Sequence, residues 1–236
     1  MRRVVDIVIG GGIALVALPL ILMLALVAAG VFRANPFFVQ SRVGFQGKDF
    51  RLWKLRSLPV STPTYADKYA LREVPVPRFG RLIRRLHLDE LPQLFHVPLG
   101  QMSLVGPRPE MRFLHERLDD GFARARVSVR PGCTGLWQVS KASEQLILET
   151  PEYDSFYLRH RTLRFDLWIL WHTVRKVVGA GKRLTLADVP SWVLGDREVP
   201  AAVAETDEPH EAEVVELRHA PRAQSPLGQT ADATRW

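Results

Sequence analysis

The chain has 236 residues, of which 47% are hydrophobic, and its 32 basic against 25 acidic residues give a formal net charge of +7. This length allows one domain with appendages and a sizeable hydrophobic core. The single cysteine, Cys133, excludes a disulfide within the chain and is typical of a reducing compartment.

The charge is distributed unevenly. Residues 191–236 carry 9 acidic residues and 4 arginines, whereas residues 1–190 carry 16 acidic and 28 basic residues. A basic body suits nucleic acid, anionic lipid or a phosphorylated substrate, and charge alone does not choose among them. The Ala-, Glu- and Pro-rich tail has the composition of a disordered segment. The predicted organisation is a membrane helix at residues 1–33, a folded domain at residues 34–190 and an acidic tail at residues 191–236.

Residues 7–32 form an uncharged run that is long enough to enter a membrane, since one crossing takes ~20 apolar residues. A soluble nucleic-acid binder would not need this run. A cleaved signal peptide is a rival interpretation, but the apolar core of a signal peptide spans only ~7–15 residues. Pro19 lies near the middle, where a proline removes a backbone hydrogen bond and kinks a helix.

Basic residues lie at both ends of this run, so the positive-inside rule gives no orientation. Two kinds of anchor therefore remain open on these residues alone. One is a kinked helix that spans the membrane, and the other is a re-entrant hairpin that bends at Pro19 and returns to the same side. The basic residues are Arg2, Arg3, Arg33, Arg42 and Lys48.

After Pro36, apolar and polar residues alternate in part over residues 37–43 and 50–56. This pattern predicts a β-hairpin with a glycine-containing turn at residues 44–49. The hairpin carries three basic side chains that form either a solvated face or a phosphate clamp. They are Arg42, Lys54 and Arg56.

The rest of the chain predicts mostly helices and loops. Residues 61–77 predict a loop with one helical turn at residues 67–71. Apolar residues at three-and-four spacing in residues 79–86, with arginines between them, predict an amphipathic basic helix that could lie on anionic headgroups. A shorter helix is expected at residues 110–118. The fold class is therefore α+β, mostly helical, with amphipathic interfacial helices around a core.

Two further segments complete this pattern. Residues 130–139 contain two glycines and a proline, which predicts a tight loop that leads to a buried strand or turn. Thr162 can cap a helix at residues 163–178, closed by Gly179. Most apolar residues of this helix are expected in the core, although its two tryptophans could also lie at a membrane interface. These apolar residues are Leu167, Trp168, Leu170, Trp171, Val174 and Val178.

Two adjacent acids, Asp89 and Glu90, lie where a helix should begin, so backbone amides and the positive helix end would point at a bound phosphate. A carboxylate can attack phosphorus if it is held in line and the developing charge is neutralised. Glu90 could hold Mg²⁺, which bridges carboxylate and diphosphate oxygens. Such acidic pairs more often only complement a helix dipole. Arginines flank this pair as Arg84, Arg85 and Arg108.

Five blocks between residues 38 and 138 together resemble the bacterial sugar transferase family, the monotopic polyprenyl-phosphate phosphoglycosyl transferases. Residues 40–44 and 54–58 resemble the first two signatures of this family. Residues 88–94 carry its Asp-Glu dyad, residues 102–109 its Pro-Arg-Pro motif, and residues 130–138 its Arg-Pro-Gly-x-Thr-Gly-Leu-Trp-Gln block.

The resemblance implies a two-step reaction. Asp89 would attack the sugar-linked phosphorus of a nucleotide diphosphate sugar, usually a UDP-sugar, and release the nucleoside monophosphate. A polyprenyl phosphate would then take the sugar phosphate from the aspartate, which gives ping-pong kinetics. Asp89 and Glu90 are the implied catalytic residues and the implied Mg²⁺ ligands. The implied phosphate-binding residues are Arg42, Lys54, Arg56, Arg84, Arg85, Arg108 and Arg130.

The implied partners are the nucleotide sugar, undecaprenyl phosphate and the lipid bilayer, with no nucleic acid, and a homodimer and downstream glycosyltransferases are further expectations. The implied location is the bacterial inner membrane, with the catalytic domain on the cytoplasmic face, where the product would initiate exopolysaccharide, capsule, O-antigen or glycoprotein glycan assembly. The alternative is a membrane-tethered basic binding or scaffold protein without catalysis, which leaves the acidic dyad unexplained.

The chain departs from the family pattern at three positions. Leu18 stands where a serine often precedes the membrane proline, His87 replaces a small hydroxyl residue, and Pro98 interrupts a polar stretch. None of these removes a reacting group. The anchor of the family is a re-entrant helix broken near its centre, which favours a bend at Pro19. The transferred sugar cannot be identified, because residues 143–164 resemble the family least.

Overall fold

The computed structural model describes residues 2–65, 69, 71 and 74–194. Most of the predicted helical turn at residues 67–71 lies outside the described residues, as does the predicted tail from residue 195 onward. Within the described part, helices predominate and a small antiparallel hairpin is present, which confirms the mostly helical α+β prediction. The boundaries predicted between the segments at residues 33 and 190 stay predictions.

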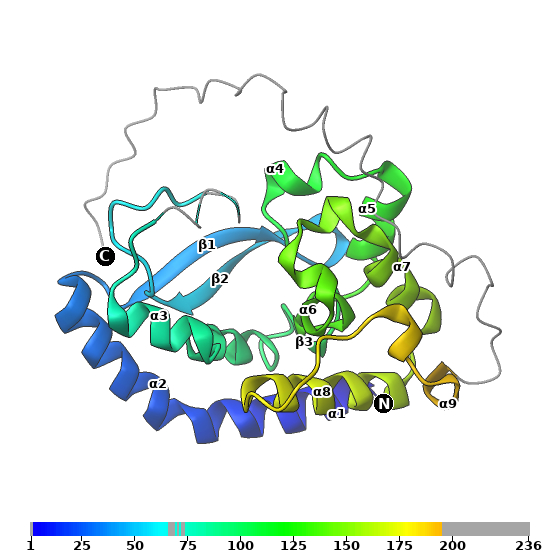
Figure 1. Ribbon diagram of the computed structural model, residues 1–236, viewed down its shortest axis with the longest axis horizontal. Coiled ribbons are helices and arrows are strands. Elements are labelled where there is room, and N and C mark those ends of the chain that lie inside the picture. Colours follow the sequence, from blue (N-terminus) through cyan, green and yellow to red (C-terminus); the bar gives the residue numbers. More distant parts are fainter. Residues whose placement is uncertain (1, 66–68, 70, 72–73, 195–236) are drawn as a thin grey trace. The chain divides into compact units, whose positions relative to one another are not determined.

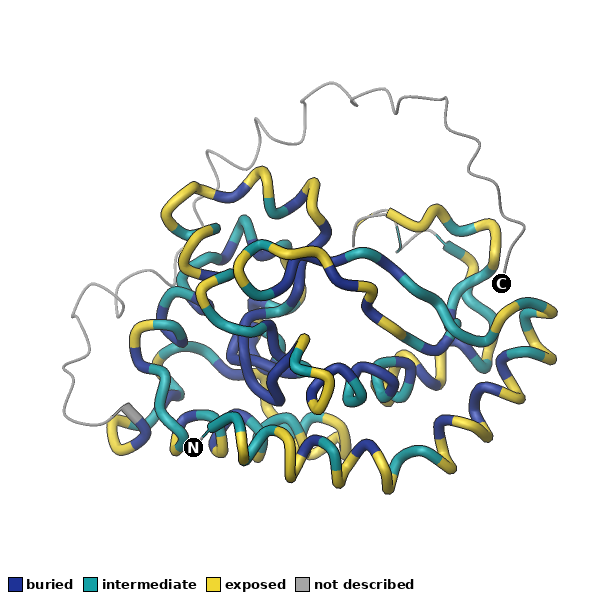
Figure 2. The backbone as a smooth tube through the Cα atoms, turned by 180° about the vertical axis from the view of Figure 1, so that it is seen from behind, coloured by how far each residue is buried: buried dark blue, intermediate teal, exposed yellow. Residues whose placement is uncertain are grey.

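The chain begins with a long apolar helix that runs from Arg2 to Phe32. It consists of α1 (Arg2–Val5), the π-helical turn η1 (Asp6–Gly10) and α2 (Gly11–Phe32), with Pro19 inside α2. Figure 1 shows α2 curving along one edge of the body, and Figure 2 shows exposed residues recurring along it. By length and composition this helix could cross a membrane.

Both ends of the apolar helix are bound to the same folded body. At its start, the Arg3 guanidinium donates to the carbonyl of Val97 at 2.7 Å. Just past its other end, the Asn35 carbonyl accepts from Nε of Arg56 at 2.7 Å. The body thus holds both ends of the helix, and it also packs against the middle of the helix at Ile21, Leu24 and Ala25.

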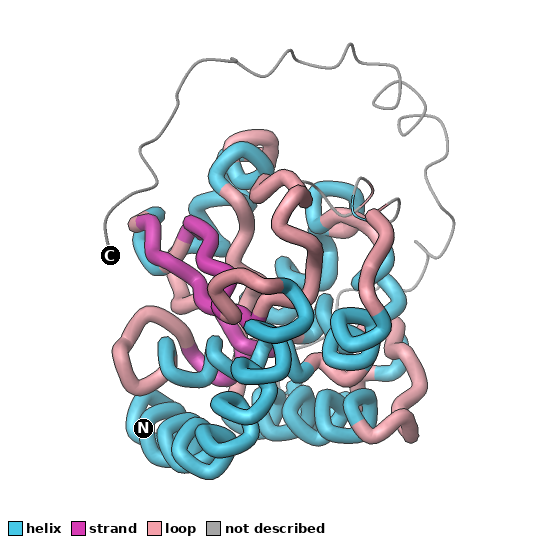
Figure 3. Tube along the Cα trace, turned by 90° about the vertical axis from the view of Figure 1, so that its left-hand side faces the viewer, coloured by secondary structure: helices cyan, strands magenta, loops and turns pink. Residues whose placement is uncertain are grey.

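The predicted hairpin is present. Strand β1 (Phe37–Val43) has the predicted bounds, and β2 (Asp49–Leu55) is shifted by one residue from the prediction. The antiparallel register places Phe38 opposite Lys54. The turn between the strands contains the 3₁₀ segment η2 (Phe45–Gly47). Figure 3 shows the two strands in a molecule otherwise made mainly of helices and loops.

The segments that carry the acidic dyad follow the hairpin. Helix α3 (Arg78–Arg85) is followed by His87, whose left-handed φ of 56° turns the chain into the 3₁₀ helix η4 (Leu88–His96). Leu88 and Leu91 of η4 pack against a core cluster. This packing fixes η4 above α2 and against β2. The buried members of the cluster are Ile21, Leu24, Ala25, Leu55 and Ile83.

A second sheet and several short helices complete the body. Strand β3 (Ser103–Val105) pairs in parallel with β4 (Gly132–Thr134), the strand predicted after residue 130. Helix α4 (Arg112–His115) is shorter at both ends than the predicted helix at residues 110–118. At its start, the Glu110 carbonyl accepts from the Val43 N–H of the hairpin at 2.9 Å instead of from a helical N–H. The remaining elements are α5 (Asp120–Val127), α6 (Leu136–Val139), η5 (Lys141–Glu144), η6 (Ile147–Glu149), α7 (Pro151–His160), α8 (Leu163–Val177), η7 (Leu186–Asp188) and α9 (Ser191–Leu194).

Helix α8 confirms the predicted helix at residues 163–178, with Thr162 Oγ1 accepting from the Phe165 N–H at 3.1 Å and Gly179 at φ 75°. The prediction that most of its apolar residues lie in the core is wrong. Trp168 is buried, but α8 packs on α6, α9, β3 and β4 through one side only. Figure 1 shows α8 along the same edge of the body as α2. Four apolar residues of α8 are 50–68% exposed. They are Leu167, Trp171, Val174 and Val178.

His96 ties the end of η4 to β2. Its fully buried ring accepts a hydrogen bond at Nε2 from the Trp53 N–H at 3.1 Å, and its Nδ1 lies 2.5 Å from Oε1 of Gln101. This pattern needs a neutral ring with the proton on Nδ1. Burial lowers the pKa of His96 below its ordinary value, and the bond to Gln101 only partly opposes this shift.

Gly80 allows α3 to approach the backbone of Ser57, two residues after β2. A Cβ at this position would clash with the carbonyl oxygen of Ser57. We expect Gly80→Ala to lower the free energy of unfolding by about 1–3 kcal/mol, because the backbone would have to move. Gly30→Ala is the control, since its Cβ meets open space on an exposed helix and should be neutral or stabilising by up to about 1 kcal/mol. Thermal unfolding in detergent would separate the two, and equal midpoints would contradict the close approach.

Acid should destabilise the fold through His96. Because its pKa is lowered in the folded state, the unfolded chain binds more protons below about pH 6.5, so stability is present above that pH and falls with acidification. His96→Phe should be less stable at about pH 7.5 but should lose less stability between about pH 7.5 and about pH 5. Denaturant unfolding at both pH values measures this, and an unchanged difference would assign the acid sensitivity to other groups.

Candidate active site

Asp89 is the second residue of η4 and its side chain is almost fully enclosed, with 6% of the residue exposed. Its Oδ2 accepts a hydrogen bond from the hydroxyl of Ser57 at 3.2 Å. Ser57 follows β2 and lies against Gly80 of α3. Three consecutive segments of the chain therefore fix the position of this carboxylate.

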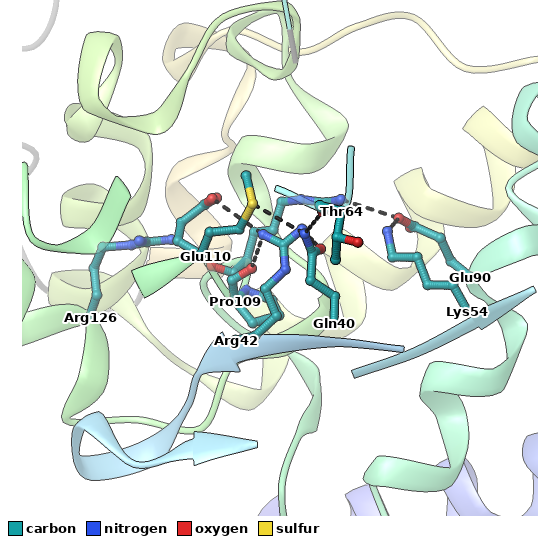
Figure 4. Close-up of polar contacts among 10 residues, drawn as sticks. Gln40, Arg42, Lys54, Thr64, Glu90, Pro109, Glu110 and Arg126 are labelled. Atoms are coloured by element: carbon teal, nitrogen blue, oxygen red, sulfur yellow. Dashed lines mark hydrogen bonds and ion pairs between the residues drawn. The ribbon is translucent and has the colours of Figure 1, made fainter. Parts of the chain in front are cut away.

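Glu90 is paired with two cations from different elements. Its Oε1 accepts from Nζ of Lys54 on β2 at 2.7 Å and from Nη2 of Arg108 at 3.2 Å, and all three side chains are about three-quarters buried or more. Figure 4 shows Lys54 and Glu90 pointing toward each other. The arrangement joins the hairpin, η4 and the Pro-Arg-Pro turn at one carboxylate.

The two adjacent acids have opposite electrostatic environments. Burial, and then the negative charge of Glu90, raise the pKa of Asp89, while Lys54, Arg84 and the Ser57 hydroxyl only partly oppose the shift. Burial also disfavours the charge on Glu90, but Lys54 and Arg108 outweigh it and hold the pKa of Glu90 well below its usual range. Environments that separate the pKa values of two neighbouring acids are typical of sites where the two have different roles.

Arg42 lies behind the Pro-Arg-Pro turn and is 9% exposed. Its Nη1 donates to the carbonyl of Pro109 at 3.2 Å and its Nη2 to Oε1 of Gln40 at 2.6 Å, as Figure 4 shows. Glu110 lies 3.7 Å away as its counter-ion. Burial lowers the pKa of Arg42 to about 10, so the side chain stays charged at neutral pH. The described hydrogen bonds of Arg42 are donated to Pro109 and Gln40 within the protein. Its role in phosphate binding stays a prediction.

The other predicted phosphate ligands are spread around this centre. Arg84 and Arg85 are exposed at the end of α3, and the charge of Arg84 lowers the pKa of Asp89. Nε of Arg56 donates to the carbonyl of Asn35 instead of to the dyad. Arg130 donates to the carbonyl of Gly100 at 2.8 Å, and its guanidinium lies 4.9 Å from the centre of a phenylalanine ring. Among the described contacts, those of Lys54 and Arg108 reach the dyad directly.

Sequence reasoning assigned no role to two residues that the fold brings to the site. Ser57 lies inside the signature at residues 54–58, and its position directly after the predicted strand at residues 50–56 is the available signal. Lys176 of α8 donates to the carbonyl of Gln138 at 2.5 Å, and the charges of Glu90 and Arg108 both act on its pKa, which burial lowers. No local pattern distinguishes Lys176 from a solvated lysine on an amphipathic helix.

The donor set fits Mg²⁺ only as an ion shared with a substrate. The described residues contain no group of three or more His, Cys, Asp or Glu side chains that could hold a metal. Asp89 and Glu90 supply the hard oxygen ligands that Mg²⁺ prefers, and this ion commonly uses one or two carboxylates together with phosphate oxygens and water. The chemistry of the dyad therefore suits a magnesium diphosphate.

Comparison with known proteins places the chain in a family. The sequence model of the family described as "Bacterial sugar transferase" matches residues 1–180. The chain is 35% identical over 181 residues to the UDP-N-acetylgalactosamine-undecaprenyl-phosphate N-acetylgalactosaminephosphotransferase of Aeromonas hydrophila, with 72% of this chain and 43% of the relative covered.

Two further relatives agree with this result. The chain is 37% identical over 175 residues to the UDP-glucose:undecaprenyl-phosphate glucose-1-phosphate transferase of Xanthomonas campestris pv. campestris, covering 67% of this chain and 35% of the relative. It is 34% identical over 195 residues to the undecaprenyl-phosphate galactose phosphotransferase of Salmonella typhimurium, covering 75% and 40%. The chain thus spans about two fifths of the length of these relatives, and it belongs to the bacterial sugar transferase family.

Proposed function

We propose that this protein transfers a sugar phosphate from a UDP-sugar to undecaprenyl phosphate. The single observation that carries the proposal is the buried dyad, in which Asp89 is held by Ser57 while Glu90 is paired with Lys54 and Arg108. The names of the relatives, which describe this transfer for three different sugars, support the substrate classes.

In the first step, an oxygen of Asp89 attacks the sugar-linked phosphorus of the donor. A P–O bond to the aspartate forms, the P–O bond to the bridging diphosphate oxygen breaks, and its electron pair leaves on the phosphate of UMP. Because Oδ2 accepts the hydrogen bond from Ser57, we assign the attack to Oδ1. A raised pKa makes the Asp89 carboxylate a stronger base and nucleophile once it is ionised.

Positive charge close to the dyad removes the repulsion between an anionic nucleophile and an anionic substrate. Lys54 and Arg108 are held in place by Glu90 before any substrate binds, so they need no reorganisation to stabilise charge in the transition state. Glu90 and Asp89 would hold Mg²⁺ together with the diphosphate. The ion would neutralise the diphosphate and stabilise the leaving UMP.

In the second step, a phosphate oxygen of undecaprenyl phosphate attacks the same phosphorus. The new P–O bond forms as the bond to Asp89 breaks, and the carboxylate is restored. The product is undecaprenyl-diphosphate-sugar, which would initiate a bacterial surface or glycoprotein glycan. Homodimer formation and contacts with downstream glycosyltransferases stay predictions.

We further propose that the apolar helix is a re-entrant anchor and that the catalytic body lies on the cytoplasmic face of the inner membrane. The support is that the body binds both ends of the helix, through Val97 at the start and Arg56 near the end. A spanning helix would separate these ends by the whole bilayer. Pro19, which lacks an N–H, allows the bend.

Asp89→Asn should lower turnover by at least ~10³-fold, because it removes the group that forms the covalent bond. The measurement is UMP release by detergent-solubilised protein with Mg²⁺, undecaprenyl phosphate and a panel of UDP-sugars. Asp120→Asn, the same substitution at an exposed position, is the matched control and should retain activity.

Omitting undecaprenyl phosphate tests the intermediate itself. Wild-type protein should release at most one equivalent of UMP and gain the mass of one sugar phosphate on Asp89. Turnover of Asp89→Asn near the wild-type rate would exclude the aspartyl intermediate. Absence of UMP release from every donor, in folded wild-type protein, would contradict the proposed reaction as a whole.

Cysteine labelling tests the anchor. In a Cys133→Ser background, single cysteines at Arg2 and Asn35 should react with a membrane-impermeant maleimide from the same side of sealed vesicles. Lys48→Cys, on the exposed hairpin turn, marks the side of the body. Labelling of position 2 from the side opposite to positions 35 and 48 would establish a spanning helix instead.

A further inference from the structure

The Pro107-Arg108-Pro109 turn is held through its carbonyl groups. Two of its three residues are prolines and have no N–H, so the carbonyls are the main groups available to anchor it. Each of the three is used. The Pro107 carbonyl accepts from the Gly132 N–H at 2.9 Å, that of Arg108 from Nη2 of Arg126 at 2.7 Å, and that of Pro109 from Nη1 of Arg42 at 3.2 Å.

Arg126 makes two contacts at once. Its Nε donates to Oδ2 of Asp154 at 2.9 Å, while its Nη2 donates to the carbonyl of Arg108. Arg126 lies on α5 and Asp154 on α7, and the two residues are 5% and 1% exposed. The rigid fork of a guanidinium can bridge a carboxylate and a carbonyl in this way, whereas a lysine ammonium is a single flexible point.

Stability alone is a poor explanation for this buried pair. Taking both charges out of water is costly, and apolar residues of similar volume often serve a core as well or better. A second buried pair, Arg42 with Glu110, lies against the same turn. Figure 4 shows Arg42 rising from β1 to Pro109 and Arg126 approaching on the side of Glu110. Two buried arginines thus converge on the backbone of the segment whose side chain reaches Glu90.

We propose that Arg126, fixed by Asp154, is a positioning residue that holds the Arg108 backbone so that the Arg108 guanidinium stays on Glu90 and on the substrate phosphate. Arg126 acts through Arg108 and does not itself contact the reacting atoms. This inference rests on the proposed function for its kinetic consequence. Its structural consequence, the immobilisation of Arg108, can be measured without any turnover.

The kinetic test uses two substitutions of the pair. Arg126→Lys keeps the charge opposite Asp154 but cannot bridge to the turn, and the double variant Arg126→Met with Asp154→Leu removes both charges without leaving one unpaired. Both should lower kcat for UMP release by about tenfold or more, with KM for the UDP-sugar changed less, because the lost contact matters most in the transition state. Arg112→Met, which breaks an exposed ion pair with Asp49, is the control and should keep the wild-type kcat.

Epistasis separates a positioning role from a general loss of structure. In an Arg108→Ala background, adding the double substitution at Arg126 and Asp154 should cause little further loss of kcat, because the side chain being positioned is already gone. A purely structural defect would multiply the two losses.

The second measurement is independent of activity. Phenylglyoxal modification followed by mass spectrometry reports how freely Arg108 reacts, with the exposed Arg112 as the internal reference. In the folded double variant, modification of Arg108 should become about threefold faster or more, since its backbone contact and the resulting order are lost.

The outcomes are distinct. A folded double variant that keeps both wild-type kcat and wild-type protection of Arg108 would overturn the positioning role. If the two losses of kcat multiply in full in the Arg108→Ala background, the positioning role is overturned as well. If wild-type protein releases no UMP from any donor, the proposed function fails, and the reactivity of Arg108 in the variants still decides whether Arg126 immobilises it.

Discussion

The rest of the site depends on the pairing of Glu90 with Lys54 and Arg108. One carboxylate oxygen holds a lysine from the hairpin and an arginine from the turn after β3, at 2.7 Å and 3.2 Å. Without Glu90, two cations would face each other in a partly buried site. Burial, and then the charge of Arg108, lower the pKa of Lys54, and Glu90 opposes both. Glu90 therefore makes it possible to gather positive charge beside Asp89 before a phosphate arrives, which is the condition for preorganised electrostatic stabilisation.

The same constraint explains why the neighbouring acids differ. Lys54 and Arg108 hold the pKa of Glu90 low, so Glu90 stays charged. Burial and the negative charge of Glu90 raise the pKa of Asp89, and Lys54, Arg84 and the hydrogen bond from Ser57 only partly oppose this shift. Both acids lie near basic groups, but only Glu90 makes direct ion pairs with Lys54 and Arg108, whereas the described hydrogen bond of Asp89 comes from the neutral hydroxyl of Ser57. The opposite pKa shifts of the two acids therefore follow from which cations each one contacts directly.

Sequence reasoning found what local signals encode. Alternation and a glycine-containing turn gave the bounds of β1 and nearly those of β2, and Thr162 and Gly179 marked the ends of α8. It could not find contacts between distant segments, such as that of Ser57 with Asp89. It also misjudged α8, because an apolar helix face that is left exposed has the same composition as one that is buried in a core.

The position of η4 explains how one site could serve a soluble donor and a lipid acceptor. Leu88 and Leu91 pack against the core cluster that includes Ile21 and Leu24 of α2, so the dyad lies one layer of side chains from the proposed anchor. Helices α2 and α8 lie along the same edge of the body in Figure 1, and both carry exposed apolar side chains. Under the proposed function, a membrane that meets this edge would bring the lipid phosphate to the level of the dyad. The contacts of Leu88 and Leu91 with α2 would then fix the distance of Asp89 from the membrane.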